Sequence, residues 1–347
     1  MIAAFAGLAA AVVGLFAFTA VAARVIEARY PPVGECVATA PGGPAIHVVE
    51  RPPRAPERGA MLLVHGASGN YADLDLAIGE RLSGLGFRVF AVDRPGHGWS
   101  DRLAGAAAAS PAAQAAALRA ALVKTGQTRA IVVVHSLSGV LGLAMALDAP
   151  DFVRGLVLLA PVSHPWPGGV AWYYRLAASP IFGPAFRRLI VLPAGLVSMK
   201  SGVRDVFAPS PPPKDYLEAT RLPLVFRPGH FRANAEDVVA AEAYVAQLSP
   251  CYATIRTPTV IVTGDRDGVV YASLHAAGCA RDIPGATLTV LPGVGHSPHH
   301  SAPDSVVAAI LDVEARALSA ERRQPGRAPA ASDAATIADG GVRRALI

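Results

Sequence analysis

One serine of this chain occupies a position that suits a nucleophile. Residues 131–134 are β-branched and apolar, as in a strand buried on both faces, and residues 140–145 are rich in Leu, Ala and Met and predict a helix. Ser136 lies on the short turn between them. Such a turn strains its central residue, exposes that side chain, and points the next N–H, of Leu137, at whatever the hydroxyl attacks. The pattern favours nucleophilic catalysis; an ordinary strand-to-helix junction with an incidental serine is the alternative.

The segment Val134-His135-Ser136-Leu137-Ser138 resembles the G-x-S-x-G turn of the α/β-hydrolase family, with Val134 and Ser138 at the two glycine positions. Side chains there must be small because strand and helix approach closely. Ser138 is small and precedes Gly139, whereas the branched Val134 departs from the pattern. The resemblance implies an α/β fold whose doubly wound sheet is mostly parallel.

A second segment carries the same resemblance. After an expected strand at residues 89–92, residues 93–101 read Asp-Arg-Pro-Gly-His-Gly-Trp-Ser-Asp, similar to the family's D-x-P-G-H-G-x-S-D turn. We interpret this turn as a marker of the fold. His97, between two glycines, is expected to buttress the loop and not to act as a base.

The resemblance also implies the partners of the serine. Gly264-Asp265-Arg266-Asp267 follows an expected strand and resembles the family's G-D-x-D turn, in which the second carboxylate orients the catalytic histidine. On that match Asp267 is the acid, and Asp265 caps or braces the turn. His296 follows the expected strand 287–291, where the family carries its general base. Since each turn follows a strand, we expect Ser136, Asp267 and His296 to meet at one edge of a parallel sheet.

These three residue types suit acyl transfer. A serine hydroxyl needs an imidazole to take its proton, and a carboxylate holds that imidazole in the right tautomer. Two N–H donors must also face the developing oxyanion. The turn His65-Gly66-Ala67 resembles the family segment that supplies one donor, so we expect the N–H groups of Ala67 and Leu137 to form the oxyanion hole.

Serine at this position argues against epoxide opening and halide displacement, for which family members use an aspartate. The expected reaction is hydrolysis of an ester, thioester, lactone or C–C bond of a small, apolar substrate through an acyl-enzyme, without a cofactor. Two alternatives remain open. One is cofactor-free haloperoxidase or perhydrolase chemistry. The other is an inactive binding or scaffold protein at the membrane, which the departure at Val134 motivates.

His299 and His300 raise the question of a metal site together with His296. Acidic or cysteine ligands are not near them in sequence, so no metal is expected. We expect these two histidines to buttress the loop of His296 or to face solvent.

The chain begins with a candidate membrane span. Residues 2–23 are 22 residues without a charge, which as a helix would reach about 33 Å. We favour an uncleaved, single-pass anchor of the bacterial inner-membrane type over a secretory signal, for which Ala20-Val21-Ala22 could be the cleavage site. Arginines follow the span, which favours a cytoplasmic catalytic domain, and the three scattered cysteines agree with a reducing compartment.

The net charge of +5 and pI near 9.3 come from dispersed arginines. Without a basic run interleaved with aromatics, nucleic acid is not an expected partner. The expected partners are a small-molecule substrate and the membrane.

We expect the 347 residues to divide into an anchor and juxtamembrane segment (1–30), the first part of the core (31–160), a lid insertion (161–250), the second part of the core (251–318) and a disordered tail (319–347). The insertion is where the strand–helix alternation lapses. Its aromatic residues either line an apolar substrate pocket or pack the core of the lid itself; the pocket candidates are Trp166, Trp172, Tyr173 and Phe231.

Overall fold

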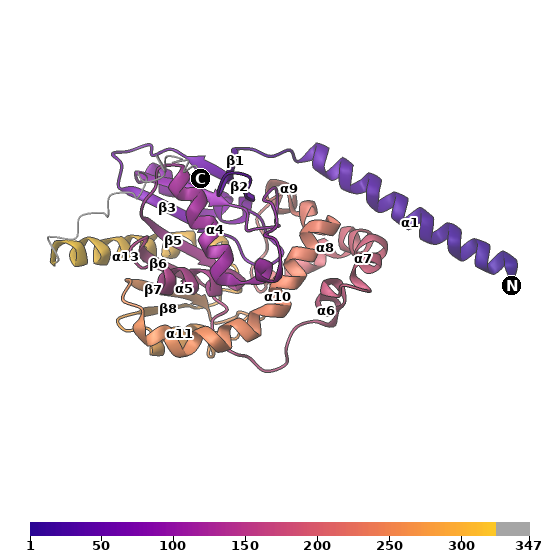
Figure 1. Cartoon of the computed structure of the whole chain (residues 1–347). Helices are drawn as coiled ribbons and strands as arrows, with labels where there is room; N and C mark the ends of the chain where they lie inside the picture. Colours follow the sequence, from indigo (N-terminus) through magenta and orange to yellow (C-terminus); the bar gives the residue numbers. More distant parts are fainter. Residues whose placement is uncertain (324–347) are drawn as a thin grey trace, which may run out of the picture.

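Eight strands form one sheet in the order β1-β2-β4-β3-β5-β6-β7-β8 in the computed structural model, which describes residues 1–323 (Figure 1). The strands are β1 Glu35–Ala38, β2 Ala45–Arg51, β3 Gly59–Val64, β4 Phe87–Val92, β5 Ala130–His135, β6 Val153–Leu159, β7 Thr259–Gly264 and β8 Thr287–Leu291. Strands β1, β2 and β4 pair antiparallel, and every other pairing is parallel. The mostly parallel α/β sheet expected from the sequence is therefore present.

The central strands are buried on both faces because nearly every residue in them is apolar. In β5, Val132 and Val134 pack in one core cluster, whereas Ile131 and Val133 pack in another on the opposite face. The same alternation holds in β3, β4, β6 and β7.

Helices cover both faces of this sheet. One core cluster joins the sheet to α4 Pro111–Lys124, α5 Gly139–Asp148 and α11 His275–Asp282. The other joins it to α2 Ala72–Leu74, η1 Asp75–Gly79, α3 Glu80–Gly84 and α13 Pro303–Arg323. Ser110 caps α4 by accepting a hydrogen bond from the N–H of Ala113, and Pro111 occupies the first helical turn. The doubly wound arrangement places every β-strand-to-helix turn of the parallel strands at one edge.

A helical insertion lies between β6 and β7. It comprises α6 Trp172–Ala178, α7 Gly183–Phe186, η4 Arg187–Val191, α8 Leu192–Phe207, α9 Tyr216–Ala219, η5 Leu222–Phe226, α10 Pro228–Leu248 and η6 Ser249–Thr254. Residues of α10 hydrogen-bond to the turns that follow β3 and β4: Asn234 bonds Ser68 and Asp237 bonds Arg94. The insertion therefore packs over the carboxyl ends of the parallel strands.

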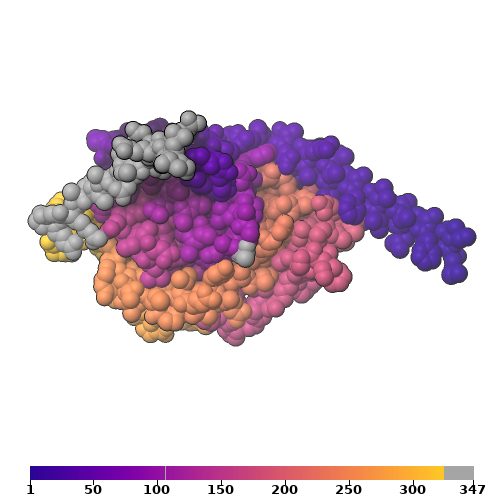
Figure 2. All heavy atoms as spheres, viewed as in Figure 1, coloured from indigo at the N-terminus to yellow at the C-terminus, as the bar shows by residue number. Residues whose placement is uncertain are grey.

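The N-terminal helix α1, Ile2–Arg29, projects from the body of the protein (Figures 1 and 2). Its best 18-residue window has a mean hydropathy of 2.2, so it is long and apolar enough to cross a membrane, as signal sequences also are. Its C-terminal part packs against the rest of the protein: Thr19 and Ile26 are buried, and Ile26 and the following Tyr30 pack with Leu192 and Leu224 of the insertion.

The C-terminal helix α13 continues to Arg323, five residues past the expected boundary at 318. Glu321 receives hydrogen bonds from Arg154 and an ion pair from Arg129, and these contacts anchor the last turn. The expectation of a disordered tail beginning at residue 319 is therefore wrong for residues 319–323, and its remainder, 324–347, lies outside the described residues.

Candidate active site

Ser136 lies on a tight turn between β5 and α5, in the 3₁₀ segment η3 Ser136–Ser138. Its φ is +53°, a left-handed conformation that is uncommon for a residue with a side chain. Two glycines permit the turn. A Cβ on Gly66 would lie 2.9 Å from the Cβ of Ser136, and a Cβ on Gly139 would lie 2.7 Å from the Cβ of Pro161. The chain thus uses backbone strain and close approach to present this hydroxyl.

His296 lies between Ser136 and Asp267. Its Nε2 is 2.9 Å from Oγ of Ser136, and its Nδ1 is 2.8 Å from Oδ2 of Asp267. The other carboxylate oxygen of Asp267 accepts hydrogen bonds from the N–H groups of Val269 and Val270, at 2.8 and 2.9 Å. The structure thus brings together three residues that are 131 and 29 positions apart in the sequence (267 − 136 and 296 − 267).

The three side chains are sheltered from solvent. Ser136 is 7% exposed and His296 is 3% exposed. The loop that carries His296 is braced by Asp265, whose Oδ1 accepts a hydrogen bond from the N–H of Gly293 at 2.7 Å. A nearly dry site strengthens hydrogen bonds among these groups.

The turn after β3 lies beside the serine turn because β3 and β5 are neighbours in the sheet. The N–H of Ala67 has no hydrogen-bond acceptor among residues 1–323, so it is free to bind a ligand. The next residue, Ser68, has a φ of +52°, a second strained position at this edge.

Asn234 of α10 clamps that turn. Its Oδ1 accepts a hydrogen bond from the N–H of Ser68 at 2.7 Å, and its Nδ2 donates to Oγ of Ser68 at 3.1 Å. Tyr174 of α6 also reaches Oγ of Ser68, at 3.5 Å. Asn234 was not singled out from the sequence, and Tyr174 was considered only as one of the aromatic residues of the insertion, because the order of residues there carries no sign of contact with residue 68.

His135, the residue before Ser136, contacts the backbone of the histidine loop. Its Nε2 donates a hydrogen bond to the carbonyl oxygen of His296 at 2.9 Å. Burial holds the pKa of His135 well below its usual value, so its ring is neutral. This bond ties the nucleophile turn to the histidine loop.

Asp73 connects three parts of the molecule. Its carboxylate accepts hydrogen bonds from Nε2 of His299 at 3.2 Å, from Nε2 of His300 at 3.0 Å and from the hydroxyl of Tyr216 at 2.8 Å. Burial alone would raise the pKa of Asp73, but His299 and His300 hold it well below its usual value. The two histidines lie on α12 Pro298–Ser301, shortly after His296. They therefore buttress the loop of His296, which is one of the two roles expected from the sequence.

The donor atoms of Asp73, His299 and His300 lie within 4.8 Å of one another, a spacing that could hold a metal ion. His296, which the sequence grouped with them, faces Ser136 and Asp267 instead. The Asp73 carboxylate accepts hydrogen bonds from three protein donors, and through them it braces the segments that carry these residues.

The turn after β4 is held by the carboxylate of Asp93, which accepts hydrogen bonds from the N–H groups of Tyr71 and Trp99. His97 is buried and contacts Nη2 of Arg94 through its Nε2, at 2.9 Å. This position matches the buttressing role expected of His97.

The four aromatic residues named as pocket candidates lie in different surroundings. Trp172 is 69% exposed, and Tyr173 lies beside it at the surface. Trp166 packs against His275, and Phe231 is buried in a cluster within the insertion with Ala177, Val191 and Ala235. The sequence left open whether these residues line a pocket or pack the core of the insertion, and Phe231 packs that core.

Comparison with known proteins agrees with this architecture. The family model for the alpha/beta hydrolase fold matches residues 59–303. Uncharacterised proteins of Mycobacterium tuberculosis and Mycobacterium bovis are 30% identical over 260 residues, which cover 70% of this chain and 72% of theirs.

Solved structures with the same fold include an enol-lactonase from Burkholderia xenovorans (19% identity, TM-score 0.62, covering 80% of this chain and 98% of that one). Another is an esterase from a Rhodococcus species (19% identity, TM-score 0.60, covering 81% of this chain and 98% of that one). A third is a meta-cleavage product hydrolase from Pseudomonas fluorescens (20% identity, TM-score 0.61, covering 82% of this chain and 98% of that one). From its sheet, its family match and these structural relatives, the chain belongs to the α/β-hydrolase fold family.

Proposed function

We propose that this protein is a serine hydrolase that cleaves an ester, thioester, lactone or C–C bond of a small, apolar substrate through an acyl-enzyme. One observation carries the proposal: Oγ of Ser136 is 2.9 Å from Nε2 of His296, whose Nδ1 is 2.8 Å from Oδ2 of Asp267. These distances are within reach for proton transfer from the hydroxyl to the imidazole.

In the proposed reaction His296 takes the proton of Ser136 as Oγ attacks the substrate carbonyl. Asp267 keeps Nδ1–H of His296 in place and stabilises the imidazolium that forms. The imidazolium then gives its proton to the leaving group, which departs and leaves an acyl group on Ser136. A water molecule, deprotonated by His296, releases the acid and restores the serine.

The N–H groups of Ala67 and Leu137 are the proposed donors to the oxyanion. Both lie in the turns just past the carboxyl ends of the neighbouring parallel strands β3 and β5, and Gly66 permits the two turns to approach. In this proposal Asn234 fixes the position of the Ala67 donor through Ser68. Preorganised donors of this kind contribute about 2.7–4 kcal/mol each to lowering the barrier.

The relatives define the range of acyl groups to test. They include an enol-lactonase, an esterase and a meta-cleavage product hydrolase. We propose that the insertion is a lid, since Ser136 is only 7% exposed beneath it. The enclosed site favours a compact substrate.

We further propose that α1 anchors the protein in a membrane as a single span. Its length and hydropathy support this proposal, as do Arg24 and Arg29, which follow its uncharged stretch of residues 2–23. By the positive-inside rule these arginines favour a cytoplasmic catalytic domain.

Hydrolysis of p-nitrophenyl acetate, butyrate, octanoate and palmitate by the full chain in detergent tests the proposal. We expect turnover that prefers the shorter esters and falls at least about 10³-fold in the Ser136→Ala variant. Turnover that survives this substitution would remove Ser136 from the mechanism. Absence of turnover on every ester offered would favour the binding or scaffold alternative.

A further inference from the structure

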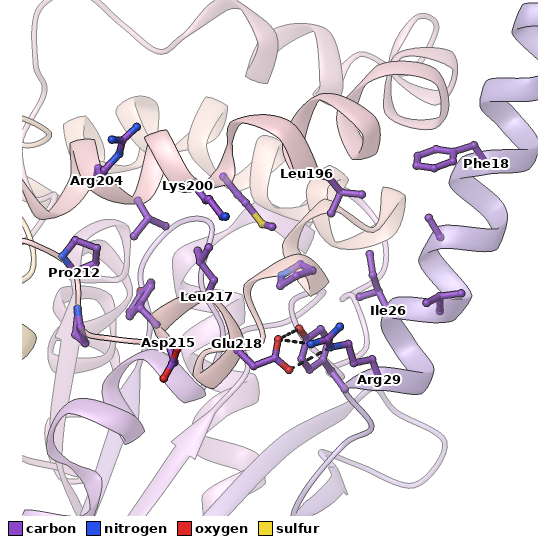
Figure 3. Close-up of a pocket in the computed structure, with 18 of the residues that line it drawn as sticks. Phe18, Ile26, Arg29, Leu196, Lys200, Arg204, Pro212, Asp215, Leu217 and Glu218 are labelled. Carbon is purple, nitrogen blue, oxygen red and sulfur yellow. Dashed lines mark hydrogen bonds and ion pairs between the residues drawn. The ribbon is translucent and has the colours of Figure 1, made fainter.

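A groove separates the anchor helix α1 from the insertion, apart from the site at Ser136 (Figure 3). Its volume is about 1090 Å³, at the upper end of ordinary small-molecule sites. One wall is α1 and the other is α8, with residues 212–218 closing the third side. We call this space the anchor groove.

Apolar side chains form both walls of the anchor groove. Phe18 and Ile26 project from α1 toward α8, and Leu196 projects from α8 toward α1 (Figure 3). Val21 and Met199 complete these walls. Moving apolar side chains of this kind from contact with water to contact with hydrocarbon is energetically favourable.

The groove lies where the anchor would leave a bilayer. Phe18 and Val21 belong to the uncharged stretch of residues 2–23, yet they line a space shared with the insertion. Thr19, in the same stretch, is buried against the rest of the protein at 2% exposure. If residues 2–23 cross the membrane, the insertion must therefore touch its surface.

The insertion carries further exposed apolar side chains. Helix α6 and the helical stretch Gly183–Phe207, which meet at a bend of 111°, are together long and apolar enough for a membrane span. Large apolar side chains are exposed at the start of α6 (Trp172), at the bend (Ile181 and Phe182) and on α8 (Val197). Exposed side chains of this kind are typical of a surface that enters the membrane interface.

Charge is unevenly distributed in the groove. Glu218 is occupied by Arg29 and by the hydroxyl of Tyr30, at 2.9 and 2.6 Å. Lys200 and Arg204, one helical turn apart on α8, have no carboxylate partner among residues 1–323. Asp215 also lines the groove. Two positive side chains thus face one negative side chain, and the α8 wall attracts an anion.

We propose that the anchor groove holds an anionic phospholipid of the surrounding bilayer, with its acyl chains between α1 and α8 and its head-group phosphate at Lys200 and Arg204. Lipid binding in this groove would hold the insertion on the membrane surface. This inference goes beyond the proposed hydrolase activity and depends on the proposed membrane anchor, not on the catalytic residues.

Photocrosslinking of the full chain in nanodiscs tests this inference. The probes are phosphatidylglycerol and phosphatidylcholine that carry a diazirine on one acyl chain, and adducts are mapped by peptide mass spectrometry. We expect phosphatidylglycerol to label α8 between Leu196 and Val203 as well as α1. We expect phosphatidylcholine to label α1, and to label α8 about tenfold less than phosphatidylglycerol does.

Two variants and one matched control sharpen the result. The pair Lys200→Glu and Arg204→Glu should lower labelling of α8 by phosphatidylglycerol about tenfold. Met199→Trp should narrow the groove and lower that labelling without a change of charge. Arg119→Glu with Lys124→Glu, exposed residues on α4 with the same change of charge, should leave it unaltered.

Two outcomes would overturn the proposal: equal labelling of α8 by both lipids, or adducts on α1 with none on α8. Ester hydrolysis measured on the same samples reports on Ser136 separately. A failure of the hydrolase proposal is thereby distinguished from a failure of lipid binding.

Discussion

Val134 and Gly142 fit against each other where β5 passes α5, directly behind Ser136. A Cβ on Gly142 would lie 2.9 Å from Cγ2 of Val134 and 3.1 Å from its Cγ1. Strand and helix therefore approach closely even though a branched residue occupies the usual glycine position on the strand. The glycine that permits the approach is on the helix.

This relationship predicts the effect of Gly142→Ala. Overpacking should destabilise the fold by about 1–3 kcal/mol, against about 1 kcal/mol gained from the helix propensity of alanine. Adding Val134→Ala should restore part of the loss, because it removes the methyl groups that clash. A double-mutant cycle in urea measures the coupling. Additive effects of the two substitutions would contradict the fit.

Asn234→Leu tests the clamp on the turn of Ala67. Loss of two hydrogen bonds to Ser68 should displace the Ala67 N–H and lower kcat about 10- to 100-fold with little change in KM, if that donor serves the transition state. Asn234→Asp keeps the acceptor for the Ser68 N–H and should recover part of kcat. Steady-state kinetics on a short ester checks both variants, and an unchanged kcat in Asn234→Leu would exclude this role.

Arg94 and Asp237 form a buried ion pair between the turn after β4 and α10, at 3.0 Å, and the Arg94 side chain is fully buried. Burial lowers the pKa of Arg94 to about 10, so it remains charged at neutral pH. Asp237→Asn should destabilise the fold by about 3–5 kcal/mol because it leaves that charge without its partner. Arg54→Met breaks the exposed pair with Glu80 and, as a control, should cost under about 1 kcal/mol. Equal effects in urea denaturation would contradict this prediction.

Stability should fall in mild acid because buried histidines are neutral in the folded protein. Burial lowers the pKa of His65 and of His275 to about 4, and the unprotonated Nδ1 of His275 accepts hydrogen bonds from the N–H groups of Ser163 and His164. The unfolded chain binds these protons from about pH 6.5 downward.

Since the unfolded state binds more protons between pH 6.5 and about 4, stability is fully present above this window and decreases as the pH falls through it. The expected slope is at most about 1.4 kcal/mol per pH unit for each histidine. Urea denaturation at pH 7.5 and pH 5 measures the decrease, which His275→Gln should reduce. Identical stability at the two pH values would refute the assignment.

Much of the fold is local in origin, and for that reason it could be predicted. Apolar runs such as residues 131–134 and 259–263 form the buried strands, and Ser110 with Pro111 sets the start of α4. By contrast β1 is a four-residue, largely exposed strand without an apolar pattern. Its pairing with β2 depends on contacts that its own sequence does not display.

The candidate site was partly predictable for the same reason. Ser136, Asp267 and His296 each follow a strand in a recognisable turn, and the structure places them within hydrogen-bonding distance. Asp73 has no motif around it, so its bonds to His299 and His300 could not be foreseen. The position of Trp172 was also beyond prediction, because an aromatic side chain fits a pocket and an exposed membrane-facing surface equally well.

Labelling of the full chain with a fluorophosphonate, followed by intact-mass measurement and peptide mapping, tests the central proposal most directly. Only a serine whose proton is removed by a neighbouring base reacts rapidly. The account predicts a single adduct on Ser136, none on the neighbouring Ser138, and none in the His296→Ala variant. An unlabelled wild-type chain, or an adduct that forms equally fast without His296, would contradict it.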